Sequence, residues 1–273
     1  MSVPIRLPGL QGGLTARPMA ADDHDVVAAL IDADWLPGRL PARQRTPEPN
    51  GETFVVVDAR ERVAGAVRCR VRPADRAGLI VWLHGRENFG VMAALVVLAR
   101  VRLGRRLLYA CTGPATATGI PGLPVEHRPE TERALMAAGF SPVSAQRYFL
   151  RDLTMAPPAP PGYPLADVNS IAAPPGWQLE LTDTDGAHIA SAILRAPTPE
   201  TAGMAVLWQL AVRTEHRRKG VATHLLAQCL HHAAAHGAHH VTADAADGDI
   251  PAARLLAASG FLPLDTLTVY HHP

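Results

Sequence analysis

The sequence has no excess of charge of either sign. Its 273 residues include 26 Lys and Arg against 25 Asp and Glu, which gives a formal net charge of +1. Proteins that bind nucleic acids through their phosphates usually carry a marked basic excess. We therefore expect no nucleic acid among the partners of this protein.

Cysteine and long apolar runs are also scarce. The three cysteines, Cys69, Cys111 and Cys229, are odd in number and stand in apolar surroundings, so we expect buried, reduced thiols. The longest apolar run, residues 91–99, is too short to span a bilayer, and residues 1–13 lack the apolar segment of a signal peptide. We expect a cytoplasmic protein without a membrane partner, and the abundance of Ala, Arg, Pro and Gly suggests a GC-rich bacterial genome.

A short basic turn with a glycine follows a strand-like run near the C-terminus. Residues 205–212 are apolar and strand-like, Arg217-Arg218-Lys219-Gly220 form the turn, and a helical apolar pattern begins at Val221. The first N–H groups of a helix have no partner inside it and carry partial positive charge. Gly lets the backbone approach a ligand closely, and the basic side chains add charge-assisted bonds. The turn therefore predicts a site for a phosphate or diphosphate.

The turn and its neighbours are similar to the motifs of one family. Arg217-x-x-Gly220-x-Ala222 resembles the (Gln/Arg)-x-x-Gly-x-(Gly/Ala) signature of the GNAT N-acetyltransferases, and residues 210–217 resemble its lead-in, with Thr214 where Pro is usual. Residues 249–261 resemble the N-x-x-A-x-x-L-Y-x-x-x-G-F segment that follows in this family. The resemblance implies an α/β fold with a mixed α+β sheet.

The chain also resembles itself. Residues 133–142 and 254–263 both read as a helix stopped by Gly and followed by Phe, and Gly90-Val91 echoes Gly220-Val221. A Pro-rich stretch separates the two parts, because such Pro density disfavours helices and central strands. We predict two tandem GNAT-like domains, residues 1–153 and 177–273, joined by a linker over residues 154–176.

The first copy reads as complete but altered at its phosphate turn. We predict a strand at 16–18, a helix capped by Asp22 or Asp23, a hairpin of 54–58 with 63–72, a strand at 79–84, a helix at 89–103 and a strand at 107–112. Its turn, residues 84–90, lacks the signature. Glu87 places negative charge where a phosphate would sit, and Phe89 and Met92 are bulky where the family has small residues. We expect this copy to support the second and to form a wall of the acceptor site, since the C-terminal copy carries the activity in tandem members of the family.

The resemblance implies that acetyl-coenzyme A is the acyl donor. In this family the donor's arm lies where two parallel strands separate, which here means residues 207–212 and 240–245. Asp249 is a further candidate contact, and it is also a candidate cap for the helix after it, which has Pro251 in its first turn. The expected donor-binding residues are Leu210, Ala211, Val212, Arg217, Arg218, Lys219, Gly220, Val221, Ala222, Thr223 and Asp249.

The proton-transfer groups of the family are absent from their usual places. Gln209 stands where many relatives have Glu or Asp, and Leu256 stands where the thiolate-protonating Tyr is common. We leave three possibilities open: a low-pKa substrate amine, a chain of water, or other side chains. The catalytic residues stay unassigned, with His188, Asp244 and Tyr270 as candidates, followed by His271, His84 and His127.

Two other features have ordinary explanations. His232 and His236 stand one helical turn apart but have no carboxylate beside them, so we expect no metal. Trp208 and Gln209 alternate on their strand and should face opposite ways, with Trp208 packed against the core.

The expected function is transfer of an acetyl group from acetyl-coenzyme A to the amine of a small molecule, by direct attack in a ternary complex. Two alternatives stay open: a non-catalytic acyl-coenzyme A sensor or partner protein, and an acyltransferase that uses an acyl carrier protein. The acceptor is not readable, because it depends on loops, here residues 35–51, 113–130 and the linker. We expect a monomer or a homodimer.

Overall fold

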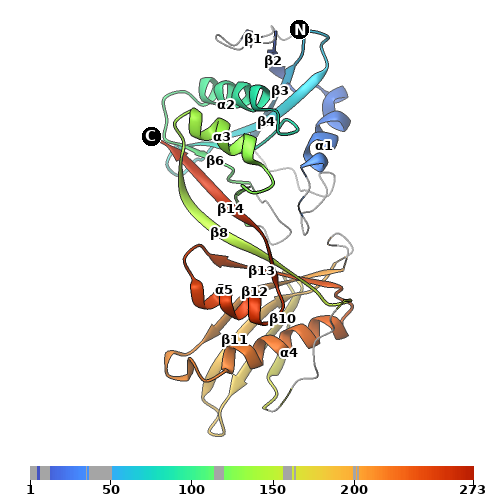
Figure 1. The fold of residues 1–273 in the computed structure, drawn as a ribbon, viewed down its shortest axis with the longest axis vertical. Coiled ribbons are helices and arrows are strands. Elements are labelled where there is room, and N and C mark those ends of the chain that lie inside the picture. Colours follow the sequence, from blue (N-terminus) through green and yellow to red (C-terminus); the bar gives the residue numbers. More distant parts are fainter. Residues whose placement is uncertain are drawn as a thin grey trace. The chain divides into compact units, whose positions relative to one another are not determined.

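The computed structural model describes residues 5–6, 13–34, 36, 51–113, 120–155, 162, 164–198, 201 and 203–273 (Figure 1). Most of the predicted acceptor loop 35–51, part of the loop 113–130 and part of the linker lie outside these residues. The chain divides into two compact units. The first is Met1–Ala145 with Asp265–Pro273, and the second is Gln146–Leu264.

The sheet of the first unit is antiparallel except for one parallel pair, β5 with β6. The strand order is β1-β2-β3-β4-β5-β6-β14, and the short β7 also pairs with β14. The strands are β1 (Ile5–Arg6), β2 (Thr15–Pro18), β3 (Gly51–Val57), β4 (Val63–Val71), β5 (Gly78–His84), β6 (Leu108–Ala110), β7 (Leu123–Pro124) and β14 (Leu262–His272).

Helices cover both faces of this sheet. Side chains alternate along β3, so that Phe54 and Val56 join the cluster of α2, whereas Val55 and Val57 join the cluster of α1. The helices of the first unit are α1 (His24–Ala33), which follows the 3-10 turn η1 (Ala21–Asp23), α2 (Phe89–Leu103) and α3 (Pro129–Ala137).

The second unit repeats the same order of strands and helices with fewer parts. Its strand order is β8-β13-β12-β11-β10-β9, and β12 with β13 is its parallel pair. The strands are β8 (Ser141–Asp152), β9 (Asp167–Ile171), β10 (Gly176–Thr182), β11 (His188–Arg195), β12 (Met204–Val212) and β13 (His240–Ala246), and the helices are η4 (Thr214–His216), α4 (Val221–Ala235) and α5 (Ile250–Ala258).

Both long helices of the second unit lie on one face of its sheet. α4 packs on β10, β11 and β12, and α5 packs on β13. Their apolar side chains belong to a single core cluster, and Figure 1 shows both helices on the side of the strands nearer the viewer. In the described part of this unit, no helix covers the other face. We call that surface the helix-free face.

The elements follow the sequence predictions closely. The predicted helix 89–103 is α2, the predicted hairpin 54–58 with 63–72 is β3 with β4, and the predicted strands 79–84 and 107–112 match β5 and β6. The tandem arrangement is present, since β5-α2-β6 and β12-α4-β13 are the same unit of a parallel pair with its helix.

Two local predictions need correction. Residues 167–171, which we assigned to the linker, form β9 and pair with β10, because they lie beyond the densest run of prolines. Asp23 stands at the start of α1 but its side chain makes no cap bond. It pairs with Arg17 and accepts the N–H of Ala20 at 2.7 Å instead.

The last strand of each repeat pairs within the unit of the other repeat. β8 follows α3 of the first repeat, yet its residues from Gln146 on pair with β13 of the second unit. β14 follows α5 of the second repeat, yet its end pairs with β6 and β7 of the first unit. The compact units therefore differ in extent from the predicted segments at residues 146–153 and 265–273.

Candidate functional site

The start of α4 is an uncapped helix terminus. Gly220 is its N-cap residue, with φ 79°, and no side chain caps the helix there. The first helical bond joins the N–H of His224 to the carbonyl of Gly220 at 3.0 Å, so the N–H groups before His224 have no partner inside the helix. A Cβ at Gly220 would meet nothing within 4 Å, which leaves room for a ligand.

Basic side chains surround this terminus. Arg217, Arg218 and Lys219 are exposed, and Arg218 adopts φ 59°, a left-handed conformation that few non-glycine residues take. Arg217 reaches back, and its Nε donates to the carbonyl of Val212 at 3.1 Å. The helix dipole and the cations together favour an anion here.

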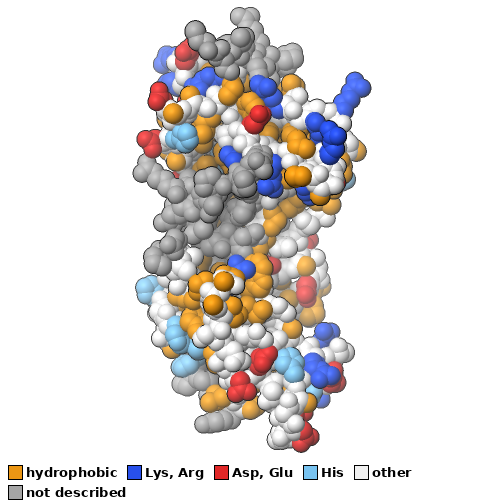
Figure 2. Space-filling view, turned by 180° about the vertical axis from the view of Figure 1, so that it is seen from behind, with side chains coloured by type: hydrophobic (Ala, Val, Ile, Leu, Met, Phe, Trp, Pro, Cys, Tyr) orange, Lys and Arg blue, Asp and Glu red, His pale blue; other side chains and the backbone are white. Residues whose placement is uncertain are grey.

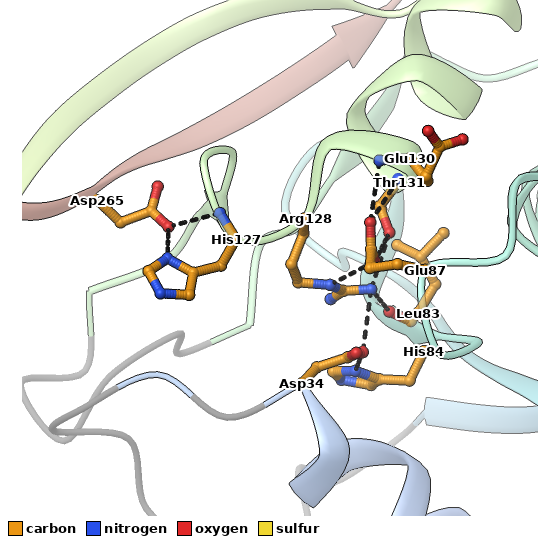
Figure 3. Close-up of polar contacts among 9 residues, drawn as sticks. All are labelled: Asp34, Leu83, His84, Glu87, His127, Arg128, Glu130, Thr131 and Asp265. Carbon is orange, nitrogen blue, oxygen red and sulfur yellow. Dashed lines mark hydrogen bonds and ion pairs between the residues drawn. The ribbon is translucent and has the colours of Figure 1, made fainter.

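The matching terminus in the first repeat is closed. The side chain of Asn88 caps α2 by accepting the N–H of Val91 at 3.1 Å. We expected Glu87 to place its charge in the phosphate position, but the structure shows that it caps α3 instead. Its carboxylate accepts the N–H groups of Glu130 and Thr131, each at 3.0 Å (Figure 3).

Next to the start of α4, the parallel strands β12 and β13 separate. They pair only at Met204 with His240, Ala205 with Val241, and Val206 with Thr242. Beyond Val206, β12 continues to pair with β11 on its other side, and β13 continues to pair with β8. The facing edges of β12 and β13 thus present backbone groups to a notch. We call it the strand notch, and Leu210, Ala211 and Val212 lie along one of its edges.

A bulge in β12 changes the direction of Trp208. The register with β11 shifts between Ile193, opposite Gln209, and Leu194, opposite Leu207, so that Trp208 is the extra residue. The guanidinium of Arg195 lies 3.6 Å from the centre of the Trp208 ring. Our prediction that Trp208 packs in the core and faces away from Gln209 is therefore wrong.

Trp208 and Gln209 both belong to the helix-free face. Directly paired residues share a face, so Gln209 lies on the face of Ile193, and Arg195 shares that face because it is two residues further along β11. The side chain of Trp208 is 45% exposed. The bulge was not readable from the sequence, since the run Leu207-Trp208-Gln209 looks like an ordinary alternating strand.

Asp244 is the candidate acid or base that lies beside the strand notch. It follows the last β12–β13 pair by two residues and shares the face of Thr242, which pairs with Val206 on the helix-free face. Burial raises the pKa of Asp244 above its ordinary value. Its β8 partner is the buried Tyr148, whose pKa burial also raises. Sequence reasoning did not single out Tyr148, because β8 belongs to the first repeat.

The other candidates lie elsewhere. His188 is exposed at the start of β11, where its carbonyl accepts from Arg213 at 3.3 Å. Tyr270 and His271 belong to the first unit, and the hydroxyl of Tyr270 donates to Glu132 at 2.7 Å. Burial and this bond raise the pKa of Tyr270.

His84 is part of a buried network in the first unit. Its Nδ1 lies 2.6 Å from Asp34, which is also 3.3 Å from the guanidinium of Arg128. Arg128 is itself buried and pairs with Glu87 at 3.0 Å (Figure 3). His84 is fully buried. Through these contacts the network connects β5, the end of α1 and the start of α3.

His127 forms a separate pair with Asp265 in the same unit (Figure 3). Its Nδ1 lies 2.6 Å from the buried carboxylate, which also accepts the N–H groups of Glu126 and His127 at 3.0 Å. About half of the imidazole is exposed. Asp265 thereby joins the first part of β14 to the chain before α3.

Several smaller predictions are confirmed. Asp249 caps α5 by accepting the N–H of Ala252 at 3.0 Å. Leu256 is buried in the core, so this position offers no proton donor. The three cysteines are buried and free, and burial raises the pKa of Cys69 and of Cys229 to about 12.

The histidine pair on α4 stacks against a tryptophan. The rings of His232 and His236 have centroids 4.1 Å apart, and each lies 4.7 Å from Trp177.

Within the described residues, no group of three potential ligands could hold a metal ion, and no helix there is long and apolar enough to cross a bilayer.

Comparisons with known proteins agree with this geometry. Residues 147–261 match the model of the acetyltransferase (GNAT) family. No curated protein sequence matches the chain. A GCN5-related N-acetyltransferase from Sphaerobacter thermophilus is similar in structure over 96% of each chain, with a TM-score of 0.62 and 15% identity.

Two further solved structures share the fold over most of the chain. A tandem GNAT protein from the clavulanic acid biosynthesis pathway covers 95% of this chain and 98% of its own, with a TM-score of 0.60 and 19% identity. A GCN5-related N-acetyltransferase from Kribbella flavida covers 91% and 96%, with a TM-score of 0.54 and 16% identity. Residues 147–261 therefore match the acetyltransferase (GNAT) family, and the chain has the fold of a tandem GNAT protein.

Proposed function

We propose that the second unit transfers an acetyl group from acetyl-coenzyme A to the amine of a small molecule. The observation that carries this proposal is the open start of α4, where uncapped N–H groups, Gly220 and three cations face free space. The strand notch beside it supports the proposal, since its backbone groups suit the amides of the pantetheine arm. The diphosphate would bind at residues 217–223.

The chemistry needs a neutral amine close to the thioester carbonyl. Asp244 is suited to accept the proton of the ammonium group, because its raised pKa makes it a stronger base than an ordinary carboxylate. The amine nitrogen then bonds to the carbonyl carbon, and the carbon–sulfur bond breaks as the thiolate of coenzyme A leaves. The thiolate takes up the second proton that the nitrogen loses as the amide forms. A backbone N–H on the edge of β12 would stabilise the oxyanion. Holding both substrates in place supplies much of the remaining rate.

A matched pair of glycine variants tests the donor site. Gly220→Glu puts a carboxylate where the diphosphate would lie, whereas Gly186→Glu makes the same change in the β10–β11 turn. Both glycines lie in the second unit, at φ 79° and 80°, and a Cβ would meet nothing within 4 Å at either. The two variants therefore carry a similar backbone strain.

We expect release of free coenzyme A from acetyl-coenzyme A, with a panel of amines, to be lost in Gly220→Glu and retained in Gly186→Glu. Arg217→Ala should raise the KM for acetyl-coenzyme A about tenfold, which corresponds to the loss of one charge-assisted hydrogen bond. Equal activity of the two glycine variants would refute the site. Binding without release above hydrolysis would indicate the sensor function, and release only from an acylated carrier protein would indicate that donor.

A further inference from the structure

The helix-free face of the second unit carries a small apolar cavity. Its volume is about 170 Å³, and its walls come from β9, β10, β11 and β12, all within the second unit. Figure 2 shows hydrophobic side chains gathered over these strands on the face turned away from α4 and α5. The lining residues used below are Ile171, Ile193, Arg195 and Trp208.

One wall of the cavity is the cation Arg195. Arg195 is half-buried, and the central carbon of its guanidinium lies over the Trp208 ring, 3.6 Å from the ring centre. Within the part of the chain that the structure describes, no carboxylate pairs with it. Burial lowers the pKa of Arg195. A cation–π contact of this kind leaves the N–H groups of a guanidinium able to bind an anion.

The nearest acidic side chain on the same strand ladder is already engaged. Glu180 shares the helix-free face, because it pairs with Ser191, but it accepts a hydrogen bond from Gln178 at 2.6 Å. Ser191 lies four residues from Arg195 along β11, which corresponds to about 13 Å at the usual rise of a strand. Among the described residues, this ladder thus offers Arg195 no free carboxylate.

The cavity is also well placed relative to the strand notch. Trp208 stands at the bulge of β12, two residues before Leu210, where the notch presents its backbone groups. Two residues of strand span about 7 Å. Asp244 lies across the notch, two residues beyond the Val206–Thr242 pair, just as Trp208 lies two residues beyond Val206 on its own strand. An acceptor that binds Arg195 with one end and places its amine at the strand notch must therefore have several bonds between these two groups.

We propose that this cavity binds the far end of the acceptor, and that the acceptor is an amine that carries a carboxylate about 7 Å from its nitrogen. Arg195 binds the carboxylate through two parallel N–H bonds, and Trp208, Ile193 and Ile171 contact the alkyl chain. The cavity has room for about five water-sized groups, enough for a carboxylate and a short chain but not for a whole drug-sized ligand. This inference rests on the proposed acyl transfer for the position of the amine.

The test compares amines that differ in one group. 6-Aminohexanoate has the required spacing, 6-aminohexanamide and hexylamine lack the charge, and glycine has the charge too close to the amine. With acetyl-coenzyme A saturating, we expect wild-type kcat/KM for 6-aminohexanoate to exceed that for either neutral amine, and that for glycine, by about tenfold or more.

Variants locate the preference. Arg195→Gln should abolish the preference for 6-aminohexanoate over 6-aminohexanamide. Arg254→Gln removes an exposed arginine on α5 and should keep the preference, which controls for net charge. Equal kcat/KM for the charged and neutral amines in wild type, or a preference that survives Arg195→Gln, would overturn the proposal even if transfer occurs.

Binding without chemistry separates this inference from the proposed function. 6-Aminohexanoate should change the tryptophan fluorescence of wild type saturably, and this change should disappear in Trp208→Phe and in Arg195→Gln. Saturable binding without acyl transfer would support the cavity and refute the proposed function. Acyl transfer to other amines without this fluorescence change would support the proposed function and refute the cavity as the acceptor site. Circular dichroism of each variant verifies that it is folded.

Discussion

Asp244 combines a functional position with a cost in stability. It lies half-buried beside the strand notch, and burial raises its pKa. A carboxyl group with a raised pKa in the folded state holds its proton more tightly there than in the unfolded chain. The free energy of unfolding therefore falls as the pH rises from the unfolded pKa of 3.8 through the higher folded pKa of Asp244. At neutral pH the buried carboxylate is charged, and the protein is less stable for it.

Asp244→Asn separates the two effects. We expect the variant to have a higher Tm than wild type at neutral pH and the same Tm below the unfolded pKa of 3.8, because wild type is then protonated as well. Its kcat should fall about a hundredfold or more, and the rise of wild-type kcat/KM with pH should disappear. Thermal melts and pH–rate profiles measure both. A lower Tm at neutral pH with unchanged kcat would contradict this role.

Single residues were predictable where their role is local. The positions of Gly220 and Asp249 follow from neighbouring residues alone, since a helix start has a local signature. The partner of Trp208 did not follow, because the bulge depends on the register with β11. Arg195 was missed for the same reason: nothing near it in the sequence shows that its partner is a tryptophan on the next strand.

At the scale of elements, the two repeats use the same helix in different ways. The start of α4 is left open by Gly220, whereas Asn88 closes the start of α2. The carboxylate of Glu87, in the same turn, binds Arg128 and the first N–H groups of α3. The turn of the first repeat thus has a structural role, because Glu87 connects it to the start of α3.

Glu87→Ala should show how much the contacts of Glu87 contribute to the free energy of unfolding. The variant leaves Arg128 buried with only part of its ion pairing and uncaps α3, so we expect a loss of about 3–5 kcal/mol. Glu130→Ala removes a carboxylate from the same helix start, but its pair with Arg133 is exposed, and we expect less than about 1 kcal/mol. Urea unfolding measures both. Equal losses would contradict the structural role of Glu87.

The elements themselves were largely predictable, since apolar periodicity and turn residues act over short stretches. The helix 89–103 was placed to the residue, and the hairpin of 54–58 with 63–72 to within three residues. The pairing of β8 with β13 and of β14 with β6 was not, because exchanged strands have the same local pattern as unexchanged ones. Only tertiary contacts decide which sheet such a strand joins.

At the scale of the whole molecule, the exchanged strands link the folding of the two repeats. Tyr270, among the largest fully buried side chains, comes from β14 but packs in the core of the first unit. The first unit therefore needs the C-terminal residues that follow the donor site in sequence. In the described part of the chain, the two copies of the fold differ at the matching helix starts, since α4 is uncapped and α2 is capped by Asn88.

The most direct measurement of this account is the calorimetric stoichiometry of acetyl-coenzyme A binding. We predict one molecule bound per chain, binding lost in Gly220→Glu, and binding unchanged in Gly90→Glu, the same substitution at the start of α2. Two molecules per chain, or binding that Gly90→Glu abolishes and Gly220→Glu leaves intact, would contradict the assignment of the donor site to the second unit.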